Sequence, residues 1–329
     1  MTMKTLLLTQ KEVAGFLTPA RANETVERAF RAYGLGQTGM PPKSYLYFPQ
    51  GDLRSMPAYI FGEGFNIAGV KCVNVHPQNG AAHLPTVMAV IILNDPQTGF
   101  PLALMDGTYV TALRTGAAGA LAAKYLSRED AAVAGFVGCG AQARAQLSCL
   151  LEVRRIRKIK LWQFAGDRAG AQAFRQWAET TYQLETLVSP RLDRVTLESD
   201  IVVTTTPSRV PLVNRVSPGT HINAIGADAP GKQEINPEIL KKAKVVVDDW
   251  AQASHSGEIN VPVNRKQLAK RNVHAELGDI VVGRKKGRIA EREITLFDAT
   301  GLAIQDISCA SVVYNALKDK RGIKSIQLF

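Results

Sequence analysis

The chain has 329 residues, of which 46% are hydrophobic and 21% charged, a composition typical of a globular protein long enough for two domains. No apolar stretch approaches the ~20 residues that cross a bilayer, so we expect a cytoplasmic protein without a membrane partner. The formal net charge is +11, but the basic clusters lack interleaved aromatic residues and a reading motif, which argues against nucleic-acid binding and favours a solvated surface that attracts anionic ligands.

The first third of the chain predicts two helices followed by a mostly antiparallel sheet. Thr9-Gln10-Lys11-Glu12 has the pattern of a capping box that opens a short helix, and an amphipathic helix is expected from Ala20 to Tyr33. Apolar runs between turn signals then predict strands. These strands are Ser44 to Phe48, Pro57 to Phe61, Gly69 to Val75 and Thr86 to Asn94. An Ala-rich helix is expected from Ala112 to Leu126.

Beyond this helix, strands alternate with helices, which predicts a parallel, doubly wound sheet. The expected strands are Ala131 to Val137, Lys158 to Phe164, Asp200 to Thr205, Thr220 to Ile225 and Lys244 to Asp248. Helices are expected at Ala143 to Val153 and Arg168 to Thr181, and a further helix in the tail is expected to pack on the first domain.

The turn after the first of these strands reads Gly138-Cys139-Gly140-Ala141-Gln142-Ala143. A strand, G-x-G-x-x-A and a helix form the arrangement that binds a dinucleotide pyrophosphate, because the glycines admit a tight turn and the helix N-terminus offers N–H groups. A purely structural turn is the alternative. A helix N-terminus can also lower the pKa of a thiol such as Cys139, although a small side chain that simply fits is the preferred interpretation.

The fold class is therefore α/β, with a Rossmann-type doubly wound parallel sheet and a second, α+β domain. We place the Rossmann domain at residues 118–300 and the other domain at residues 1–117 and 301–329. The four cysteines and five histidines show no metal-ligand spacing, so no metal site is expected.

Several motifs in the same order together resemble those of the ornithine cyclodeaminase/mu-crystallin family, and the similarity runs essentially from end to end. They are Met56-Pro57-Ala58, Gly69 to Asn74, Leu84 to Val87, Thr111 to Ala117, Gly138 to Gln142, His221 to Asp228, Pro230 to Glu234 and Phe297 to Gly301. Within the family, Met40 to Lys43, Gly51 to Pro57 and Thr204 to Arg209 look most like the archaeal-type alanine dehydrogenase branch. The resemblance implies that the α+β domain is a substrate-binding and dimerisation domain, that the protein is a homodimer, and that it performs hydride chemistry at the α-carbon of an amino acid or its imine.

The resemblance assigns roles to three residues, each of which also has a structural interpretation. Arg114 lies in the substrate-carboxylate motif and is also counted as a cofactor contact, although an Arg at a helix start can pair locally. Lys71 sits in an apolar strand, where burial would lower its pKa towards neutrality and suit it to proton transfer; an edge strand would instead turn it to water. Asp228 resembles the family's catalytic Asp, but a cap or turn is the common use of a loop Asp.

Arg54 distinguishes the branches. The cyclodeaminases resemble this chain but place a Glu at this position to bind a side-chain amine, and a cation there would repel one. Arg54 therefore favours a small amino acid whose carboxylate it binds.

Further contacts follow from motif position. Thr300 is expected at the substrate. The expected cofactor contacts are Thr86, Gly138, Gly140, Ala141, Gln142, Gln163, Thr205, Ile225, Gly226, Ala227 and Lys232. Thr205 has an ordinary strand position as its alternative. NAD(H) is expected as the cofactor, because Gln163 can still bond the ribose hydroxyls. NADP(H) is the alternative, because Gln163 stands where NAD enzymes usually carry an acid and Arg168 could accept a 2′-phosphate.

These features predict NAD(P)-dependent oxidative deamination of L-alanine to pyruvate and ammonium, and its reverse. The alternatives are an ornithine cyclodeaminase or cyclic ketimine reductase of the same family, and a non-catalytic nucleotide-binding protein of the crystallin type.

Overall fold

The computed structural model describes residues 4–329, and its contacts divide the chain into two compact units. The first unit extends to Arg114 and resumes at Leu302, and the second comprises Thr115–Gly301. The boundaries expected from the sequence fell after residues 117 and 300. Between residues 4 and 329, no helix is both long and apolar enough to cross a membrane.

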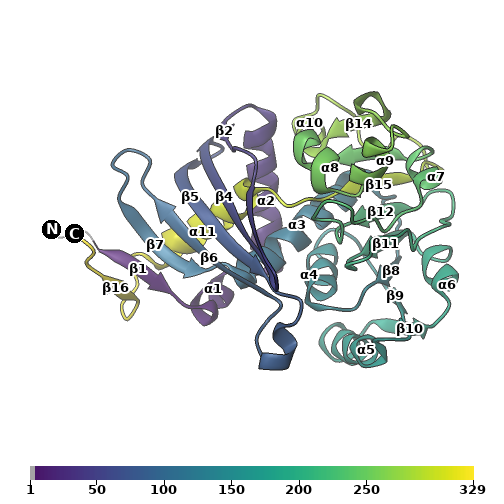
Figure 1. Ribbon diagram of the computed structural model, residues 1–329, viewed down its shortest axis with the longest axis horizontal. Helices are drawn as coiled ribbons and strands as arrows, with labels where there is room; N and C mark the ends of the chain where they lie inside the picture. The colour runs from purple at the N-terminus through teal and green to yellow at the C-terminus, as the bar shows by residue number, and fades with distance from the viewer. Residues whose placement is uncertain (1–3) are drawn as a thin grey trace. The chain divides into compact units, whose positions relative to one another are not determined.

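The first unit is built on a mixed sheet with the strand order β16-β1-β7-β6-β5-β4-β2, and β3 pairs with β4 (Figure 1). Its strands are β1 (Thr5–Leu8), β2 (Thr38–Gly39), β3 (Ser44–Phe48), β4 (Gly51–Gly62), β5 (Phe65–Val75), β6 (Val87–Asn94), β7 (Pro101–Asp106) and β16 (Lys324–Ile326). All pairs are antiparallel except β1 with β7. The mostly antiparallel sheet predicted from the sequence is confirmed.

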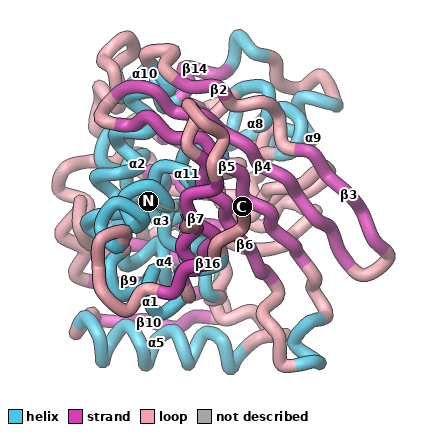
Figure 2. Tube along the Cα trace, turned by 90° about the vertical axis from the view of Figure 1, so that its left-hand side faces the viewer, coloured by secondary structure: helices cyan, strands magenta, loops and turns pink. Residues whose placement is uncertain are grey.

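Helices pack on one face of this sheet. They include α1 (Gln10–Phe16), α2 (Pro19–Gly34) and α11 (Ala303–Leu317), which lies across β4 and β5 as the expected tail helix. The predicted capping box is present, because the Thr9 N–H donates to Glu12 Oε2 at 2.7 Å and the Glu12 N–H donates to Thr9 Oγ1 at 3.4 Å. Figure 2 shows the strands of this sheet in magenta, with β4 and β5 side by side.

The outer face of the same sheet carries apolar side chains. Strand alternation turns Arg54, Met56, Ala58 and Ile60 of β4 inwards, so the intervening residues face outwards. We call Tyr59, Phe61, Val90 and Leu104 the outer apolar face; each is between 36% and 47% exposed.

The second unit contains an all-parallel sheet with the order β10-β9-β8-β11-β12-β15-β13-β14. The strands are β8 (Val133–Val137), β9 (Lys158–Trp162), β10 (Glu185–Ser189), β11 (Ile201–Thr204), β12 (His221–Ala224), β13 (Lys244–Val247), β14 (Val273–Glu276) and β15 (Thr295–Asp298). The chain order reverses between β8 and β11, which is the position at which open parallel sheets bind ligands. The predicted doubly wound sheet is confirmed.

Helices of the second unit connect these strands. The longer ones are α3 (Thr108–Leu126), in which the unit boundary falls, α4 (Ala141–Leu150) and α5 (Arg168–Tyr182). The shorter ones are α6 (Leu192–Thr196), α7 (Pro237–Leu240), α8 (Trp250–Ser256), α9 (Asn260–Asn264) and α10 (Leu277–Val281). Helices α3 and α4 thus begin four and two residues earlier than the sequence indicated.

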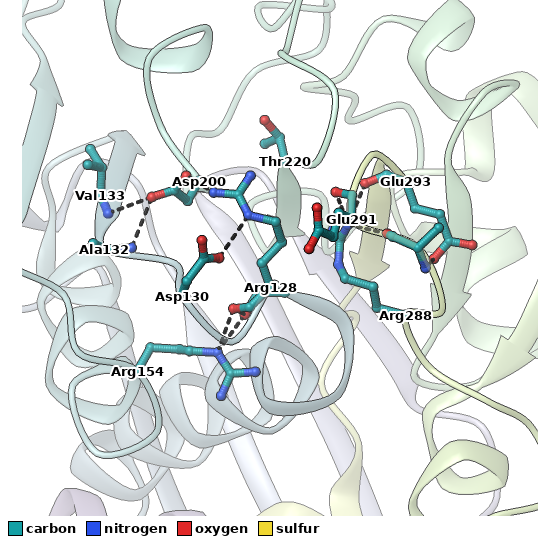
Figure 3. Close-up of polar contacts among 12 residues, drawn as sticks. Arg128, Asp130, Ala132, Val133, Arg154, Asp200, Thr220, Arg288, Glu291 and Glu293 are labelled. Atoms are coloured by element: carbon teal, nitrogen blue, oxygen red, sulfur yellow. Dashed lines mark hydrogen bonds and ion pairs between the residues drawn. The ribbon is translucent and has the colours of Figure 1, made fainter.

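Two arginines of the basic clusters satisfy backbone carbonyls instead of forming a solvated surface, which corrects the sequence-based interpretation for them. Arg154 donates from Nη2 to the carbonyl oxygen of Lys124 at 2.8 Å, and Arg288 donates from Nε to that of Leu126 at 2.7 Å, so both bind the last turn of α3. Beside them, Arg128 pairs with Asp200 (Figure 3). Arginine is suited to this because its fixed fork of donors matches exposed carbonyls at a helix end.

Candidate functional site

A buried cluster of charges lies in the first unit, where α11 and α3 contribute side chains next to β5. Lys71 Nζ is 2.8 Å from Asp306 Oδ2, and Arg114 Nε donates to Asp306 Oδ1 at 2.8 Å. Arg114 Nη1 also donates to Gln305 Oε1 at 2.8 Å. Lys71 and Asp306 are fully buried, and Arg114 is 5% exposed. The cluster therefore brings together two of the predicted site residues through an acid that the sequence did not reveal.

The environment of Lys71 explains its titration. Strand β5 lies between β4 and β6, so Lys71 is not on an edge strand turned to water. Burial, followed by the charges of Arg114 and Lys43, lowers the pKa of Lys71 to about 7, while Asp306 opposes the shift. Near neutral pH the amine can therefore both accept and return a proton.

The lowered pKa of Lys71 also predicts a pH-dependent stability. The unfolded lysine has its ordinary pKa of 10.5 and the folded one a pKa of about 7, so between these values the unfolded state binds more protons. We therefore expect the free energy of unfolding from this group to rise with pH between about 7 and 10.5. Denaturant titrations of the wild type and Lys71→Met across this pH range measure the effect. If the difference in free energy of unfolding between the two proteins does not vary with pH, the burial of a titrating amine is contradicted.

Arg54 lies on the same sheet face as Lys71, because Met56, two residues after Arg54 in β4 and so on the same face, pairs with Lys71 of β5. Its guanidinium donates from Nε to Asp52 Oδ1 at 2.8 Å and from Nη2 to Asp52 Oδ2 at 3.2 Å. Arg54 is thus a paired cation, and Asp52 is a carboxylate already neutralised by it. Thr86, also in this unit, is exposed in the loop before β6.

In the second unit, the glycine turn between β8 and α4 has the features that a dinucleotide requires. Gly138 has φ +109°, and a Cβ there would lie 2.6 Å from Thr205 Oγ1. A Cβ on Gly140 would meet nothing within 4 Å, which leaves open space at the N-terminus of α4. The Thr205 hydroxyl is buried without a partner in the described structure. Open space, helix N–H groups and an unpartnered hydroxyl fit an anionic ligand.

The loop after β12 contains the next group of predicted residues. Asp228 Oδ1 accepts from Lys232 Nζ at 2.5 Å, so the two form an ion pair within this loop. Ile225 and Ala227 are buried, and the Gly226 N–H donates to Glu234.

Other residues at or near the predicted positions have specific surroundings. Thr300 donates from its hydroxyl and its N–H to the buried Asp248, so the hydroxyl can only accept a bond from a ligand. Gln163 directly follows β9, and its N–H donates to the Ser189 carbonyl. Asp167 caps α5 by accepting from the Gly170 N–H at 2.8 Å. Gln142, like Ala141, lies in the first turn of α4.

The remaining candidates are structural. Burial raises the pKa of the Cys139 thiol to about 12, with the charge of Asp167 acting in the same direction, so the helix terminus does not activate it. His221 is hydrogen-bonded to Thr295 and Asn223, and burial lowers its pKa to about 3. Within the described part of the chain, no three acidic, His or Cys side chains form a group that could hold a metal ion.

Both the sequence and the fold are similar to those of known proteins. The model of the ornithine cyclodeaminase/mu-crystallin family matches residues 3–321. An alanine dehydrogenase from Archaeoglobus fulgidus is 52% identical over 325 residues, which cover 98% of each chain. The structure is similar to that of an archaeal alanine dehydrogenase dimer with bound NAD, with a TM-score of 0.94 at 50% identity over 99% of this chain and 100% of that one.

A reductase of the family is also similar. The Thermococcus litoralis Delta(1)-pyrroline-2-carboxylate reductase, solved in complex with NADH and L-proline, has a TM-score of 0.91 at 36% identity over 97% of this chain and 99% of that one. The match of the family model across nearly the whole sequence shows that this chain belongs to the ornithine cyclodeaminase/mu-crystallin family.

Proposed function

We propose that this protein is an NAD-dependent L-alanine dehydrogenase that converts L-alanine, water and NAD⁺ to pyruvate, ammonium, NADH and a proton, and that catalyses the reverse reaction. The observation that carries the proposal is the fully buried Lys71, which pairs with one carboxylate oxygen of Asp306 while Arg114 binds the other. The likeness to alanine dehydrogenase at 52% identity supports the choice of substrate.

Arg114 is the proposed site for the substrate carboxylate. Asp306 and Gln305 accept bonds from its Nε and Nη1, so in the described structure Nη2 is the nitrogen left for a ligand. These bonds also fix the plane of the guanidinium, which favours one orientation of the bound carboxylate. Arg54 adds positive charge on the same sheet face, and Thr86 and Thr300 are proposed as minor contacts.

Lys71 and Asp228 are the proposed proton-transfer residues. The bound dinucleotide supplies the hydride acceptor for the α-carbon. Neutral Lys71 takes the proton that the substrate ammonium must lose before the C–H bond breaks, and protonated Lys71 polarises the carbonyl oxygen of pyruvate in the reverse direction. Asp228, paired with Lys232, orients the water that attacks the imine.

The glycine turn and the segments around Thr205 and Gly226 are the proposed cofactor contacts, and NAD(H) is preferred to NADP(H). Gln163 at the end of β9 can bond to ribose hydroxyls, and the bound NAD and NADH in the two similar structures support the preference. Titration with both reduced cofactors decides between them.

A cyclodeaminase is the second candidate, and the pairing of Asp52 disfavours it. A substrate such as ornithine requires a carboxylate for its side-chain ammonium, but Asp52 is neutralised by Arg54 at 2.8 Å. A panel of alanine, ornithine, pyruvate with ammonium, and cyclic imines, assayed by nicotinamide absorbance with both cofactors, tests the proposal. Turnover of a cyclic imine without turnover of pyruvate and ammonium would replace it with a ketimine reductase.

The role of Asp306 predicts a shift in pH dependence. Because the charge of Asp306 raises the pKa of Lys71 against the effects of burial, Arg114 and Lys43, Asp306→Asn is expected to lower it. The acid limb of kcat/KM for alanine oxidation, expected near pH 7 in the wild type, should move down by about one unit. Asp52→Asn, which removes a carboxylate paired with Arg54 and not with Lys71, should leave the limb in place; a limb unmoved in Asp306→Asn would exclude Lys71 as its source.

We also propose that the protein is a homodimer formed through the outer apolar face. Monomeric proteins seldom expose continuous apolar surface of this kind, and the similar archaeal enzyme is described as a dimer. Val90→Glu is expected to give a monomer in sedimentation, because a buried unpaired carboxylate costs several kcal/mol. Ile289→Glu, at an exposed position of the second unit, should leave the mass unchanged; a dimeric Val90→Glu protein would place the interface elsewhere.

A further inference from the structure

Three fully buried carboxylates form a series in the second unit. The first accepts backbone N–H groups from the segment that carries the second, and the second from the segment that carries the third. Asp298, at the end of β15, accepts from the N–H groups of Glu258 at 2.8 Å and Ile259 at 3.0 Å. Glu258 in turn accepts from the N–H groups of Glu234 at 2.9 Å and Ile235 at 2.7 Å. All three carboxylates are 0% exposed.

Glu234, the last of the three, connects two strand ends at the carboxyl edge of the sheet. Its Oε1 accepts from the N–H of Thr206 at 2.6 Å and from the Thr206 hydroxyl at 2.7 Å. Its Oε2 accepts from the Thr204 hydroxyl at 2.7 Å and from the N–H of Gly226 at 2.9 Å. One side chain therefore fixes the end of β11 against the start of the loop after β12.

The close approach is possible only because glycine stands at the contact points. A Cβ on Gly226 would lie 2.3 Å from the Thr206 carbonyl oxygen and 2.5 Å from Glu234 Oε2. A Cβ on Gly257 would lie 2.6 Å from both carboxylate oxygens of Asp298. The segments are thus shaped around the carboxylates at both ends of the series.

The two segments that Glu234 joins carry residues already assigned to the site. Thr205 lies between the two threonines that Glu234 binds, and its hydroxyl lies next to the Gly138 turn. Asp228 and Lys232 belong to the loop that begins at Gly226. A carboxylate that fixes the spacing of these segments fixes the place of the cofactor-contacting edge and of the proposed proton-transfer residue together.

We propose that Glu234 is a positioning residue for the dinucleotide: it holds the Thr204–Thr206 segment and the Gly226 loop at the spacing that the cofactor requires, and Glu258 fixes the backbone of Glu234 by accepting its N–H group. This extends the proposed function to residues beneath the cofactor-contacting surface. Burial and then the charge of Glu234 raise the pKa of Glu258 well above its usual value, and burial also raises the pKa of Glu234 against the hydrogen bonds from Thr204, Thr206 and Gly226.

Two isosteric substitutions separate positioning from general stability. In Glu234→Gln, the amide nitrogen must face the backbone N–H of either Gly226 or Thr206, and neither can reverse its bond, so one strand end is released. In Glu258→Gln, the amide oxygen can take the place of Oε1 and keep its bonds from the N–H groups of Glu234 and Ile235. The NH₂ group then takes the place of Oε2, which accepts only a second, 3.0 Å bond from the same Glu234 N–H. The second variant is therefore the matched control.

The test measures NADH affinity by fluorescence titration, steady-state constants for alanine and NAD⁺, and amide exchange of Gly226 in the protein without cofactor. For Glu234→Gln we expect an NADH dissociation constant and a KM for NAD⁺ raised by about tenfold or more, a KM for alanine changed less than about twofold, and faster exchange at Gly226. Glu258→Gln should retain the wild-type NADH affinity. Loss of folded protein alone would lower apparent kcat without changing either KM.

Wild-type NADH affinity in Glu234→Gln, or equal losses of affinity in the two variants, would overturn the proposal. If Glu234→Gln does not fold, Thr204→Val removes one hydroxyl donor to Glu234 and should weaken NADH binding by about threefold; unchanged binding in that variant would also overturn it. A wild-type protein that binds NADH but does not oxidise alanine would refute the proposed function, whereas the NADH titrations would still decide the role of Glu234.

Discussion

Replacing Lys71 with methionine is expected to lower kcat for alanine oxidation by about a thousandfold, with the fold and the affinity for NADH preserved. Methionine has a similar length and no charge, so the buried position stays filled. Asp306 keeps Arg114 as its partner at 2.8 Å, and no buried carboxylate is left unpaired. The loss is therefore one of proton transfer and not of structure.

The measurement is a pre-steady-state and steady-state assay of Lys71→Met beside Lys11→Met, which removes an exposed lysine of α1. Lys11→Met should match the wild type in kcat and in NADH affinity. Retention of more than about a tenth of wild-type kcat in Lys71→Met would show that Asp228 or water performs the proton transfer instead, and the role of the buried cluster would be reduced to binding.

Substituting alanine for Gly138 is expected to weaken NADH binding by about a hundredfold or more. The backbone there has φ +109°, which L-residues rarely adopt, and the new Cβ would lie 2.6 Å from Thr205 Oγ1 and 3.0 Å from the Thr205 carbonyl oxygen. Relief of the clash must move the turn or the end of β11, and both border the proposed cofactor site. In enzyme active sites, a displacement of about 1 Å from the productive geometry lowers the rate by about two orders of magnitude, and we expect a comparable loss of NADH affinity here.

Gly99→Ala provides the matched control for backbone strain. Gly99 has φ +74°, and a Cβ there would meet nothing within 4 Å. This variant should lose about 1 kcal/mol of stability and keep the wild-type NADH affinity. Similar affinities in Gly138→Ala and the wild type would mean that the glycine turn does not contact the dinucleotide.

The parts of the fold that were predictable from sequence have local patterns. The capping box at Thr9 and the glycine turn after β8 are short motifs whose residues lie within a few positions of one another in the sequence. Strands β10, β14 and β15 were not predicted, because each mixes polar with apolar residues and is defined by partners distant in sequence, whereas β8, β11 and β13 are largely apolar runs of similar length.

The candidate site shows the same division. Lys71 was identifiable because a lysine within an apolar strand conflicts with its surroundings. Asp306 was missed, although an acid within the largely buried helix α11 is the corresponding signal. Only the fold shows that the two buried charges form an ion pair with each other. Glu234 was noticed only as part of a motif, since two of its hydrogen bonds come from backbone N–H groups that any sequence would supply and two from threonine hydroxyls distant in sequence.

The distribution of the thiols allows the proposed dimerisation to be followed by chemical labelling of a native cysteine. Cys149 and Cys309 are fully buried and Cys139 is 9% exposed, whereas Cys72 is partly exposed, and its pairing with Val90 across β5 and β6 places it on the outer apolar face. A maleimide should therefore label the native chain at a single cysteine. Because this face is the proposed dimer interface, the labelling rate of Cys72 is expected to fall as the protein concentration rises, which gives a readout of self-association that needs no engineered probe.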